Sequence, residues 1–221
     1  MGLPHPRDGS APSYPGLYPA LVTDIVDPDR LGRVQVRFPW LGTQGDRDVR
    51  AWATLCSPYA DRDQGLLAFP EVGSQVVVGF EAGNLRRPYV VGAAWNGQEA
   101  TPHQPDQANN TRMLRSRGDS RLVFDDTAGA PKVELTTASG HKIVLDDGGQ
   151  QITVRHAAGC EVKLTPTAVQ VTANVSVDVT AAMVNVNAPI STFSGIVKAN
   201  TLIAESTVVS PAYTPGAGNL W

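Results

Sequence analysis

Two pairs of adjacent carboxylates are the residues of this chain whose type and spacing could support acid–base or metal chemistry. They are Asp125-Asp126 and Asp146-Asp147. Two carboxylates within reach of each other can hold opposite protonation states or share a cation. Neighbouring residues on a strand, however, point to opposite faces, and each pair borders a turn that contains glycine. We therefore expect these aspartates to be turn residues, and we predict neither a catalytic nor a metal site there.

The histidines form no recognisable catalytic or metal-binding pattern. The four histidines are His5, His103, His141 and His156, and no two of them have the His-x-His spacing. No Ser, Cys or Asp arrangement accompanies His141 in the sequence, so we expect a surface histidine on a strand. P-loop, G-x-S-x-G, H-E-x-x-H and C-x-x-C motifs are missing as well. The sequence therefore predicts a protein that is not an enzyme and uses no cofactor.

Composition limits which partners the protein can bind and in which cellular compartment we expect it. The formal net charge is −3, with 18 basic and 21 acidic residues, which argues against a general nucleic-acid binder. No apolar run approaches the roughly 20 residues that a membrane helix needs, and the N-terminal residues carry no export or lipid signal, so we expect a soluble cytoplasmic product. Cys56 and Cys160 lie in segments assigned below to different domains, and we expect buried, reduced thiols.

The elements that position these residues are strands, and the most informative strand signal lies near the C-terminus. Apolar and polar residues alternate almost without a break over residues 169–190, with a change of phase at Met183-Val184 typical of a bulge. A straight strand of this length would span on the order of 70 Å at about 3.3 Å per residue. A ribbon with one apolar face cannot bury that face on itself, so we predict that identical chains wrap their apolar faces around a common axis as an intertwined homo-oligomeric β-prism. The predicted core of this assembly consists of Val169, Val171, Val175, Val177, Val179, Met183, Val184, Val186 and Ile190.

Two groups of shorter strands precede this run. The first group fits a small Greek-key barrel of five strands, at residues 20–26, 33–38, 51–55, 75–80 and 89–94. Gly83-Asn84 is expected to form a hairpin turn between the last two. The second group recurs about every ten residues, at 121–124, 132–135, 142–145, 151–155 and 161–164.

The composition divides the chain into five parts. Between the two groups of strands, the sequence is polar and contains proline, as linkers do. The predicted parts are a flexible N-terminal arm (1–17), a barrel (18–97), a linker (98–112), a needle (113–209) and a tip tail (210–221). The tip tail abandons the alternation and contains Tyr213, Leu220 and Trp221, which we predict to be apolar anchors for a partner at the tip.

Two stretches of sequence resemble the spike proteins of contractile tails. Residues 27–40 (DPDRLGRVQVRFPW) are similar to the start of the OB-fold domain of phage baseplate spikes and of VgrG in type VI secretion, and residues 89–97 resemble its final strand. Residues 139–147 (SGHKIVLDD), together with 122–126 and 134–137, resemble the neck of a triple-stranded β-helix. The resemblance implies an all-β fold in which an N-terminal OB-fold barrel is followed by an intertwined trimeric β-helix needle.

The resemblance also implies a function, that of a structural membrane-piercing spike at the centre of the baseplate of a contractile injection machine. Its expected partners are a baseplate hub protein, which the OB domain would dock, and a PAAR-like tip protein, with effector cargo as a further candidate. Such a spike is assembled in the cytoplasm and meets the target membrane transiently when the particle fires. VgrG carries a long N-terminal hub region, whereas this sequence begins close to the OB domain, so we expect the hub to be a separate protein.

Two alternatives remain open at this point. A trimeric fibre or adhesin would share the prism without needing the barrel motif. An OB-fold could instead bind single-stranded nucleic acid, and Arg33, Arg37, Phe38 and Trp40 fit its usual mixture of basic and aromatic residues. The first 97 residues contain nine arginines and ten acidic residues, which leaves no evident electropositive groove. We therefore expect no nucleic acid, and we assign Phe38 and Trp40 to core and rim packing.

Overall fold

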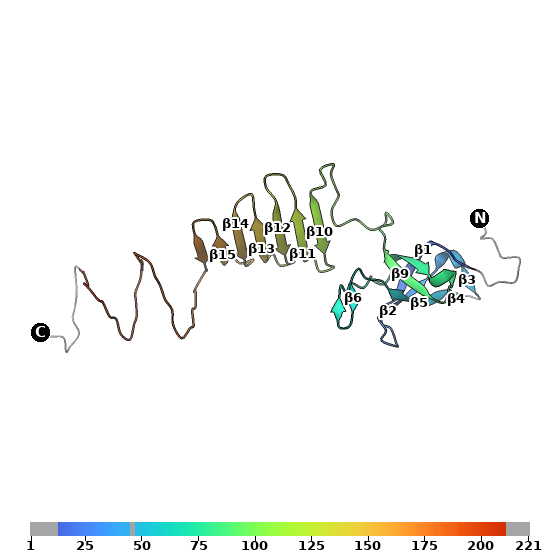
Figure 1. Cartoon of the computed structure of the whole chain (residues 1–221), viewed down its shortest axis with the longest axis horizontal. Coiled ribbons are helices and arrows are strands. Elements are labelled where there is room, and N and C mark those ends of the chain that lie inside the picture. The colour runs from blue at the N-terminus through green and yellow to red at the C-terminus, as the bar shows by residue number, and fades with distance from the viewer. Residues whose placement is uncertain (1–12, 45–46, 211–221) are drawn as a thin grey trace. The chain divides into compact units, whose positions relative to one another are not determined.

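The computed structural model describes residues 13–44 and 47–210. The described chain is almost entirely β-structure and contains a barrel, an open sheet and a C-terminal tail, which are treated separately below (Figure 1). Neither of its two helices, η1 (Pro39–Leu41) and η2 (Glu81–Gly83), is long or apolar enough to cross a membrane.

The N-terminal part is a closed five-stranded barrel. Its strands pair in the order β1-β2-β5-β9-β8 and then back to β1, and the β5–β9 pair is the one parallel pair. The strands are β1 (Leu17–Asp24), β2 (Arg33–Arg37), β5 (Arg50–Leu55), β8 (Gln75–Phe80) and β9 (Pro88–Ala93). The predicted OB-fold barrel is confirmed, with every strand end within three residues of its expected position. Four two-residue strands lie outside the barrel: β3 (Thr43–Gln44), β4 (Arg47–Asp48), β6 (Ala60–Asp61) and β7 (Gln64–Gly65).

Small and β-branched residues fill the barrel. Alternate residues of each strand point inward, so a narrow barrel can close around valine and alanine side chains. The buried set is Ala20, Val22, Val34, Val36, Phe38, Ala53, Val76, Val78, Phe80 and Val90.

Aromatic rings close one end of the barrel. Phe38 is almost completely buried, and the Trp40 ring stacks on Tyr18 with 4.6 Å between ring centroids. The indole N–H of Trp40 donates a hydrogen bond of 3.0 Å to the carbonyl oxygen of Pro19. Tyr14 packs against the same cluster. The expected core and rim roles of Phe38 and Trp40 are confirmed, and these rings are engaged in packing rather than free to stack on bases.

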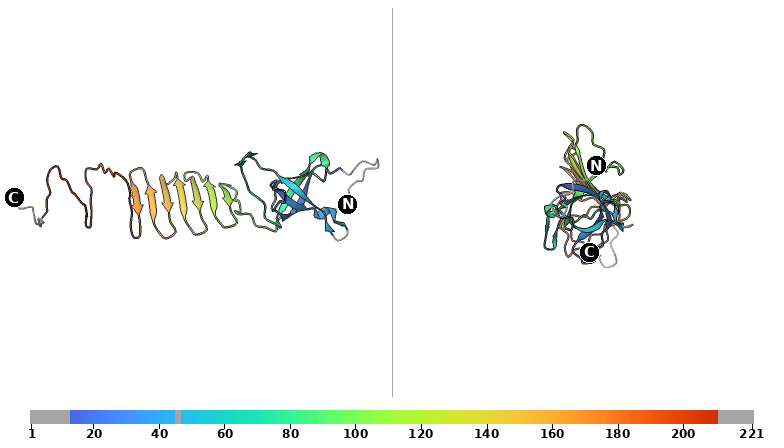
Figure 2. Two further views of the ribbon diagram at one scale, coloured as in Figure 1. Left: turned by 90° about the horizontal axis from the view of Figure 1, so that it is seen from below. Right: turned by 90° about the vertical axis from the view of Figure 1, so that its right-hand side faces the viewer.

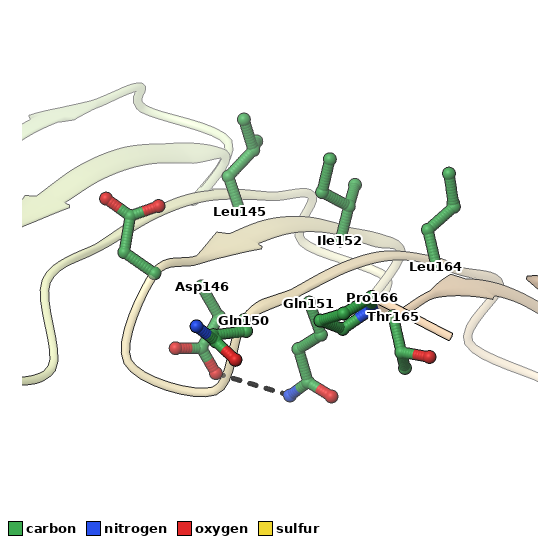
Figure 3. Close-up of a pocket in the computed structure, with 9 residues that line it drawn as sticks. Leu145, Asp146, Gln150, Gln151, Ile152, Leu164, Thr165 and Pro166 are labelled. Carbon is green, nitrogen blue, oxygen red and sulfur yellow. Dashed lines mark hydrogen bonds between the residues drawn. The ribbon is translucent and has the colours of Figure 1, made fainter. Parts of the chain in front are cut away.

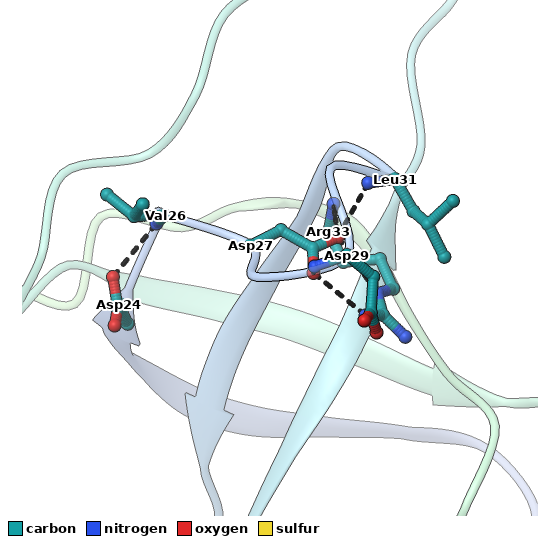
Figure 4. Close-up of polar contacts among 6 residues, drawn as sticks. All are labelled: Asp24, Val26, Asp27, Asp29, Leu31 and Arg33. Carbon is teal, nitrogen blue, oxygen red and sulfur yellow. Dashed lines mark hydrogen bonds and ion pairs between the residues drawn. The ribbon is translucent and has the colours of Figure 1, made fainter.

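An ion pair organises the turn between β1 and β2. The Asp27 side chain is only 4% exposed and accepts hydrogen bonds from Arg33 Nη2 (2.8 Å) and Nε (3.0 Å). It also accepts the backbone N–H groups of Asp29 (3.1 Å) and Leu31 (3.0 Å), as Figure 4 shows. The Arg33 guanidinium holds the pKa of the Asp27 carboxyl far below its usual range, and Asp27 in turn raises the pKa of Arg33.

The turn between β8 and β9 lies where it was predicted, but its backbone differs in detail. Ala82 (φ 50°) and Gly83 (φ 76°) take the left-handed conformation, whereas Asn84 is extended. A side chain at position 83 would also collide with Ser13. Glycine at position 83 therefore satisfies both the backbone and the close approach of the N-terminal segment.

The second part is a seven-stranded antiparallel sheet in which every strand pairs with its neighbours in sequence. Its strands are β10 (Thr111–Arg115), β11 (Arg121–Asp125), β12 (Lys132–Thr136), β13 (Lys142–Asp146), β14 (Gln151–Arg155), β15 (Glu161–Leu164) and β16 (Val169–Thr172). The sequence reasoning missed β10, which begins inside the predicted linker. Met113 and Leu114, the two apolar residues of β10, are adjacent, so the strand shows no alternation.

The carboxylates considered at the outset stabilise turns of this sheet. Asp125 accepts the backbone N–H (3.1 Å) and the hydroxyl (2.6 Å) of Thr127, and Asp146 accepts the backbone N–H of Gly149 (2.7 Å). These hydrogen bonds lower the pKa of both carboxyl groups. Their predicted role as turn residues is confirmed.

The third part, residues 173–210, forms no strand within the chain. In Figure 2 it runs as successive extended segments that are joined by bends and do not lie against one another. Every side chain from Asn174 to Ser210 is exposed. The single long strand expected over residues 169–190 is therefore wrong for one chain, since only Val169–Thr172 pairs as β16.

The two cysteines are free thiols. Cys56 is exposed and Cys160 is half-buried, so the expectation that both would be buried is wrong.

Replacing Asp27 with asparagine should lower the melting temperature of the barrel by several degrees, because it removes the charge that Arg33 and the turn N–H groups bind. The melting temperature is measured by thermal unfolding of the full chain, with tryptophan fluorescence as the signal. Asp29→Asn is the comparison variant and should have a smaller effect, because the Asp29 side chain also pairs with Arg33 (2.6 Å) but is 67% exposed. The folded pKa of Asp27 lies below the unfolded value of about 4, so its contribution is present above about pH 5 and declines as the pH falls. The difference in melting temperature between the wild type and Asp27→Asn should therefore begin to shrink below about pH 4, and part of it should remain at about pH 3, because the folded pKa lies far below the unfolded one. A difference that stays constant from about pH 7 to about pH 3 would contradict this assignment.

Candidate assembly interface

One face of the seven-stranded sheet is apolar from end to end. Cross-strand pairing sets its residues in two rows, and the residues of each row lie directly opposite one another on adjacent strands. One row is Leu114, Leu122, Leu135, Ile143, Val154, Val162 and Val171; the other is Arg112, Phe124, Val133, Leu145, Ile152, Leu164 and Val169. Arg112, in the first strand, is the single charged member.

Nothing in the described chain covers this face. Leu135 is 46% exposed, Leu145 44% and Ile152 42%, although each lies in a central strand of the sheet. Antiparallel sheets commonly pack one face on a core and leave the other to solvent. A contiguous apolar surface of this extent on a folded chain marks a site of association.

The opposite face is polar and internally paired. Figure 3 shows Leu145, Ile152 and Leu164 projecting to one side of three neighbouring strands, with Asp146 and Gln151 on the other. The amide of Gln151 donates a hydrogen bond of 3.2 Å to Asp146. The two faces therefore differ sharply in chemistry.

Ion pairs across adjacent strands follow the polar face. Lys142 Nζ lies 3.0 Å from Glu134 Oε1, and Lys132 Nζ lies 3.7 Å from Asp125 Oδ2. The Thr136 hydroxyl and then Lys142 lower the pKa of Glu134. Both ion pairs join neighbouring strands of the same chain, so they need no partner from another copy.

The structure divides the predicted core residues into two groups. Val169 and Val171 lie in β16 on the apolar face, opposite Leu164 and Val162. The remaining predicted positions lie in the tail, each between 59% and 97% exposed: Val175, Val177, Val179, Met183, Val184, Val186 and Ile190. No element of residues 13–44 or 47–210 gathers this second group. The predicted tip anchors Tyr213, Leu220 and Trp221 lie outside the described residues.

Most of the apolar face was not singled out from the sequence. Its central members, such as Leu135, Ile143 and Val154, come from strands that were themselves predicted. The signal was available, because alternate positions of each strand are apolar and turns of similar length keep them in register. The long run after residue 168 drew attention because it is continuous, whereas here the same alternation is divided among short strands.

Two histidines contact each other in the turns of the sheet. The rings of His141 and His156 lie 4.3 Å apart, in the turns before β13 and after β14. His141 Nδ1 accepts the N–H of Ala157 (3.2 Å), and His156 Nδ1 accepts that of Ala158 (3.1 Å). Both imidazoles are thus used to hold the turn that follows β14. The expected place of His141 on a strand is wrong, since it is half-buried in a turn.

No group of three or more His, Cys, Asp or Glu side chains in the described ranges could hold a metal ion. The apolar face of β10–β16 is therefore the candidate functional surface of this part of the chain.

Family comparisons match both folded parts of the chain. Residues 18–95 match the type VI secretion system/phage-baseplate injector OB domain. Residues 112–175, and again 132–191, match the phage baseplate V C-terminal trimerisation domain. The two matches to the trimerisation domain together cover the seven-stranded sheet and continue into the tail, so the sheet and the start of the tail share one sequence pattern.

Individual relatives agree with these matches. The chain is 27% identical over 135 residues to the type VI secretion system spike protein VgrG3 of Vibrio cholerae, and 34% identical over 118 residues to VgrG5 of Pseudomonas aeruginosa. It is 26% identical over 113 residues to the actin cross-linking toxin VgrG1 of V. cholerae. These alignments take in 58%, 51% and 48% of this chain but only 13%, 14% and 10% of the relatives.

Adjacent residues of β14 provide a matched test of the apolar face. Ile152 belongs to this face and Thr153 to the polar one. Ile152→Asp should abolish self-association at micromolar concentration, because leaving an unpaired carboxylate buried costs several kcal/mol. Thr153→Asp should associate as the wild type does. Light scattering of the full chains measures both; association that survives Ile152→Asp, or is lost in both variants, would contradict the assignment of the interface.

Proposed function

This chain belongs to the baseplate spike family of phages and type VI secretion systems, and from that membership we propose that three copies of it form the central spike of a contractile injection machine. The observation that carries the proposal is the uncovered apolar face of β10–β16, which lies within the residues that match a trimerisation domain. Three such sheets with their apolar faces turned inward would enclose a continuous apolar column. Completing the burial of one half-exposed leucine or isoleucine in that column contributes about 1 kcal/mol.

The tail extends this assembly by a different kind of pairing. Residues 173–210 form no strand within one chain. The match to the trimerisation domain nevertheless continues to residue 191, and apolar and polar residues alternate up to residue 190. Strands that lack neighbours in their own chain can be completed by those of other copies. We infer that the three tails intertwine, so that each apolar valine faces a shared axis.

The mechanism of such a spike is mechanical. Backbone hydrogen bonds between chains and the apolar column make bending costly, because many contacts would break together. The spike would transmit the force of contraction to a target membrane without a reaction of its own. The actin cross-linking activity for which the relative VgrG1 of V. cholerae is named belongs to that protein, of which the alignment covers 10%.

The barrel supplies the attachment in this proposal. Residues 18–95 match an injector OB domain, and we propose that the three barrels dock a baseplate hub protein. A PAAR-like tip protein held by Tyr213, Leu220 and Trp221, an effector cargo, and assembly in the cytoplasm before delivery to the target envelope complete the proposal.

The alternative functions are not favoured. The aromatic residues that suggested nucleic-acid binding close the barrel end, and Arg33 is held by Asp27 and Asp29. An adhesin would account for the trimeric prism but not for the injector OB domain that precedes it.

Val177→Asp tests the intertwined tail. Three aspartates near one axis should prevent the tails from assembling, leaving residues 173–210 open to limited proteolysis while the sheets still hold a trimer of three times 23.4 kDa. Ser176→Asp, at the next position and on the polar phase, is the control and should remain protected. The Val177→Asp trimer should still bind a hub protein through its barrels. Equal protection of both variants would show that the tail has no apolar axis.

Removal of residues 210–221 tests the tip. The truncated trimer should form normally, because the sheet and most of the tail remain, but it should no longer co-purify with a PAAR-like cap protein. Co-purification is compared with that of the full chain at equal trimer concentration. Undiminished capping would exclude Tyr213, Leu220 and Trp221 as the anchors.

A further inference from the structure

The barrel carries an ordered arm that contributes nothing to its core. Residues 56–74, here called the arm, leave the barrel after β5 and return at β8, with the β6–β7 hairpin near their middle. Most connections between strands in compact domains have about 4–6 residues, so this segment is an unusually long connection with a hairpin of its own. None of the buried core residues comes from the arm.

The arm is held in shape by its own hydrogen bonds. The Ser57 hydroxyl lies 2.9 Å from the carbonyl oxygen of Tyr59 and 2.7 Å from that of Leu66, and the Leu66 N–H donates to Tyr59 (2.9 Å). Gly65 has a φ of 145°, and a Cβ there would lie 2.6 Å from the Tyr59 carbonyl oxygen. The sequence thus builds a defined conformation for a segment that buries none of its own apolar side chains.

The apolar side chains of the arm face outward. Leu67 is 78% exposed, Leu66 58% and Tyr59 54%. Together with Leu55 and Phe69 they line one hollow beside the barrel. An ordered loop that exposes clustered apolar residues indicates an interface with another molecule.

A second apolar surface lies on the outer side of β9. Residues of β9 alternate in exposure: Tyr89 and Val91 are exposed, whereas Pro88 and Val90 are buried. Trp95 follows the strand and is 66% exposed. We call Tyr89, Val91 and Trp95 the β9 row. The row leads directly into the segment 94–110 that joins the barrel to the sheet.

We propose that the arm of each copy packs against the β9 row of the next copy around the trimer axis. This inference rests on the homotrimer proposed above. Each barrel is tethered by residues 94–110 to the sheet that trimerises, so neighbouring barrels meet at an effective concentration in the millimolar range for a short linker. A head-to-tail contact between two different surfaces closes into a ring under threefold symmetry, and arm-to-row is such a contact. The barrels then form a collar instead of three independent domains.

Cysteine cross-linking of the full chain tests the contact. In a background carrying Cys56→Ala and Cys160→Ala, the pair Leu67→Cys and Val91→Cys should give covalent dimers and trimers on a denaturing gel after mild oxidation. Each single cysteine variant should give monomers. The pair Val26→Cys and Val91→Cys is the matched control, because Val26 is 76% exposed but lies outside the arm.

The outcomes separate this proposal from the one on which it rests. If light scattering finds a trimer but the pair Leu67→Cys and Val91→Cys gives no covalent dimers or trimers, the collar is wrong and the proposed trimeric spike still stands. A monomeric wild type overturns both.

Hydrogen exchange provides an independent measurement without new cysteines. In the trimer, Leu67→Asp should raise the exchange rate of amides in residues 59–69 and around Trp95 by about tenfold or more, whereas Val26→Asp should leave both unchanged. Unchanged exchange in Leu67→Asp, or protection of the arm that appears only when a hub protein is added, would assign the arm to another partner and overturn the proposal.

Discussion

A single constraint governs this molecule: a seven-stranded sheet whose apolar face the chain itself cannot cover. The strands follow one another as a meander with turns of a few residues, and none of these turns covers the apolar rows. On the other face, Lys132 and Lys142 pair with carboxylates of neighbouring strands in the same chain. Burial of the apolar face therefore has to come from other copies, in agreement with the match of these strands to a trimerisation domain.

The barrel follows the opposite logic, because its polar and aromatic residues are used within the chain. Asp27 and Arg33 belong to the stretch that most resembles the spike family, and their geometry gives them a structural role: the carboxylate collects the turn N–H groups and the guanidinium. Trp40 closes the barrel end and satisfies its N–H on a backbone carbonyl. Residues that are characteristic of a family can thus serve to preserve its fold, and here they hold the turn and one end of the OB barrel in shape.

The sequence was sufficient for elements in which alternation and turn residues agree. The barrel strands and five strands of the sheet were predicted on that basis, as were the turn roles of Asp125 and Asp146. β10 escaped because its two apolar residues are adjacent, and the full apolar face was recognised only once cross-strand register placed Leu135 beside Ile143. The tail shows a deeper limit. Its alternation is as regular as that of any strand here, but a strand also needs a neighbour, and local sequence does not say which copy provides it.

The ten-residue strand-and-turn repeat of the sheet has an evolutionary consequence. Because each strand pairs only with its neighbours in sequence, a duplicated hairpin can be inserted into the meander without altering any other contact. The trimerisation pattern matches this chain in two frames that begin at residues 112 and 132, an offset of two strands, as expected of a series of interchangeable units. At about 4.8 Å between strands, each added hairpin lengthens the sheet by about 10 Å. The reach of such a protein can therefore be adjusted in discrete steps by gene duplication or deletion, while the barrel at its base stays unchanged.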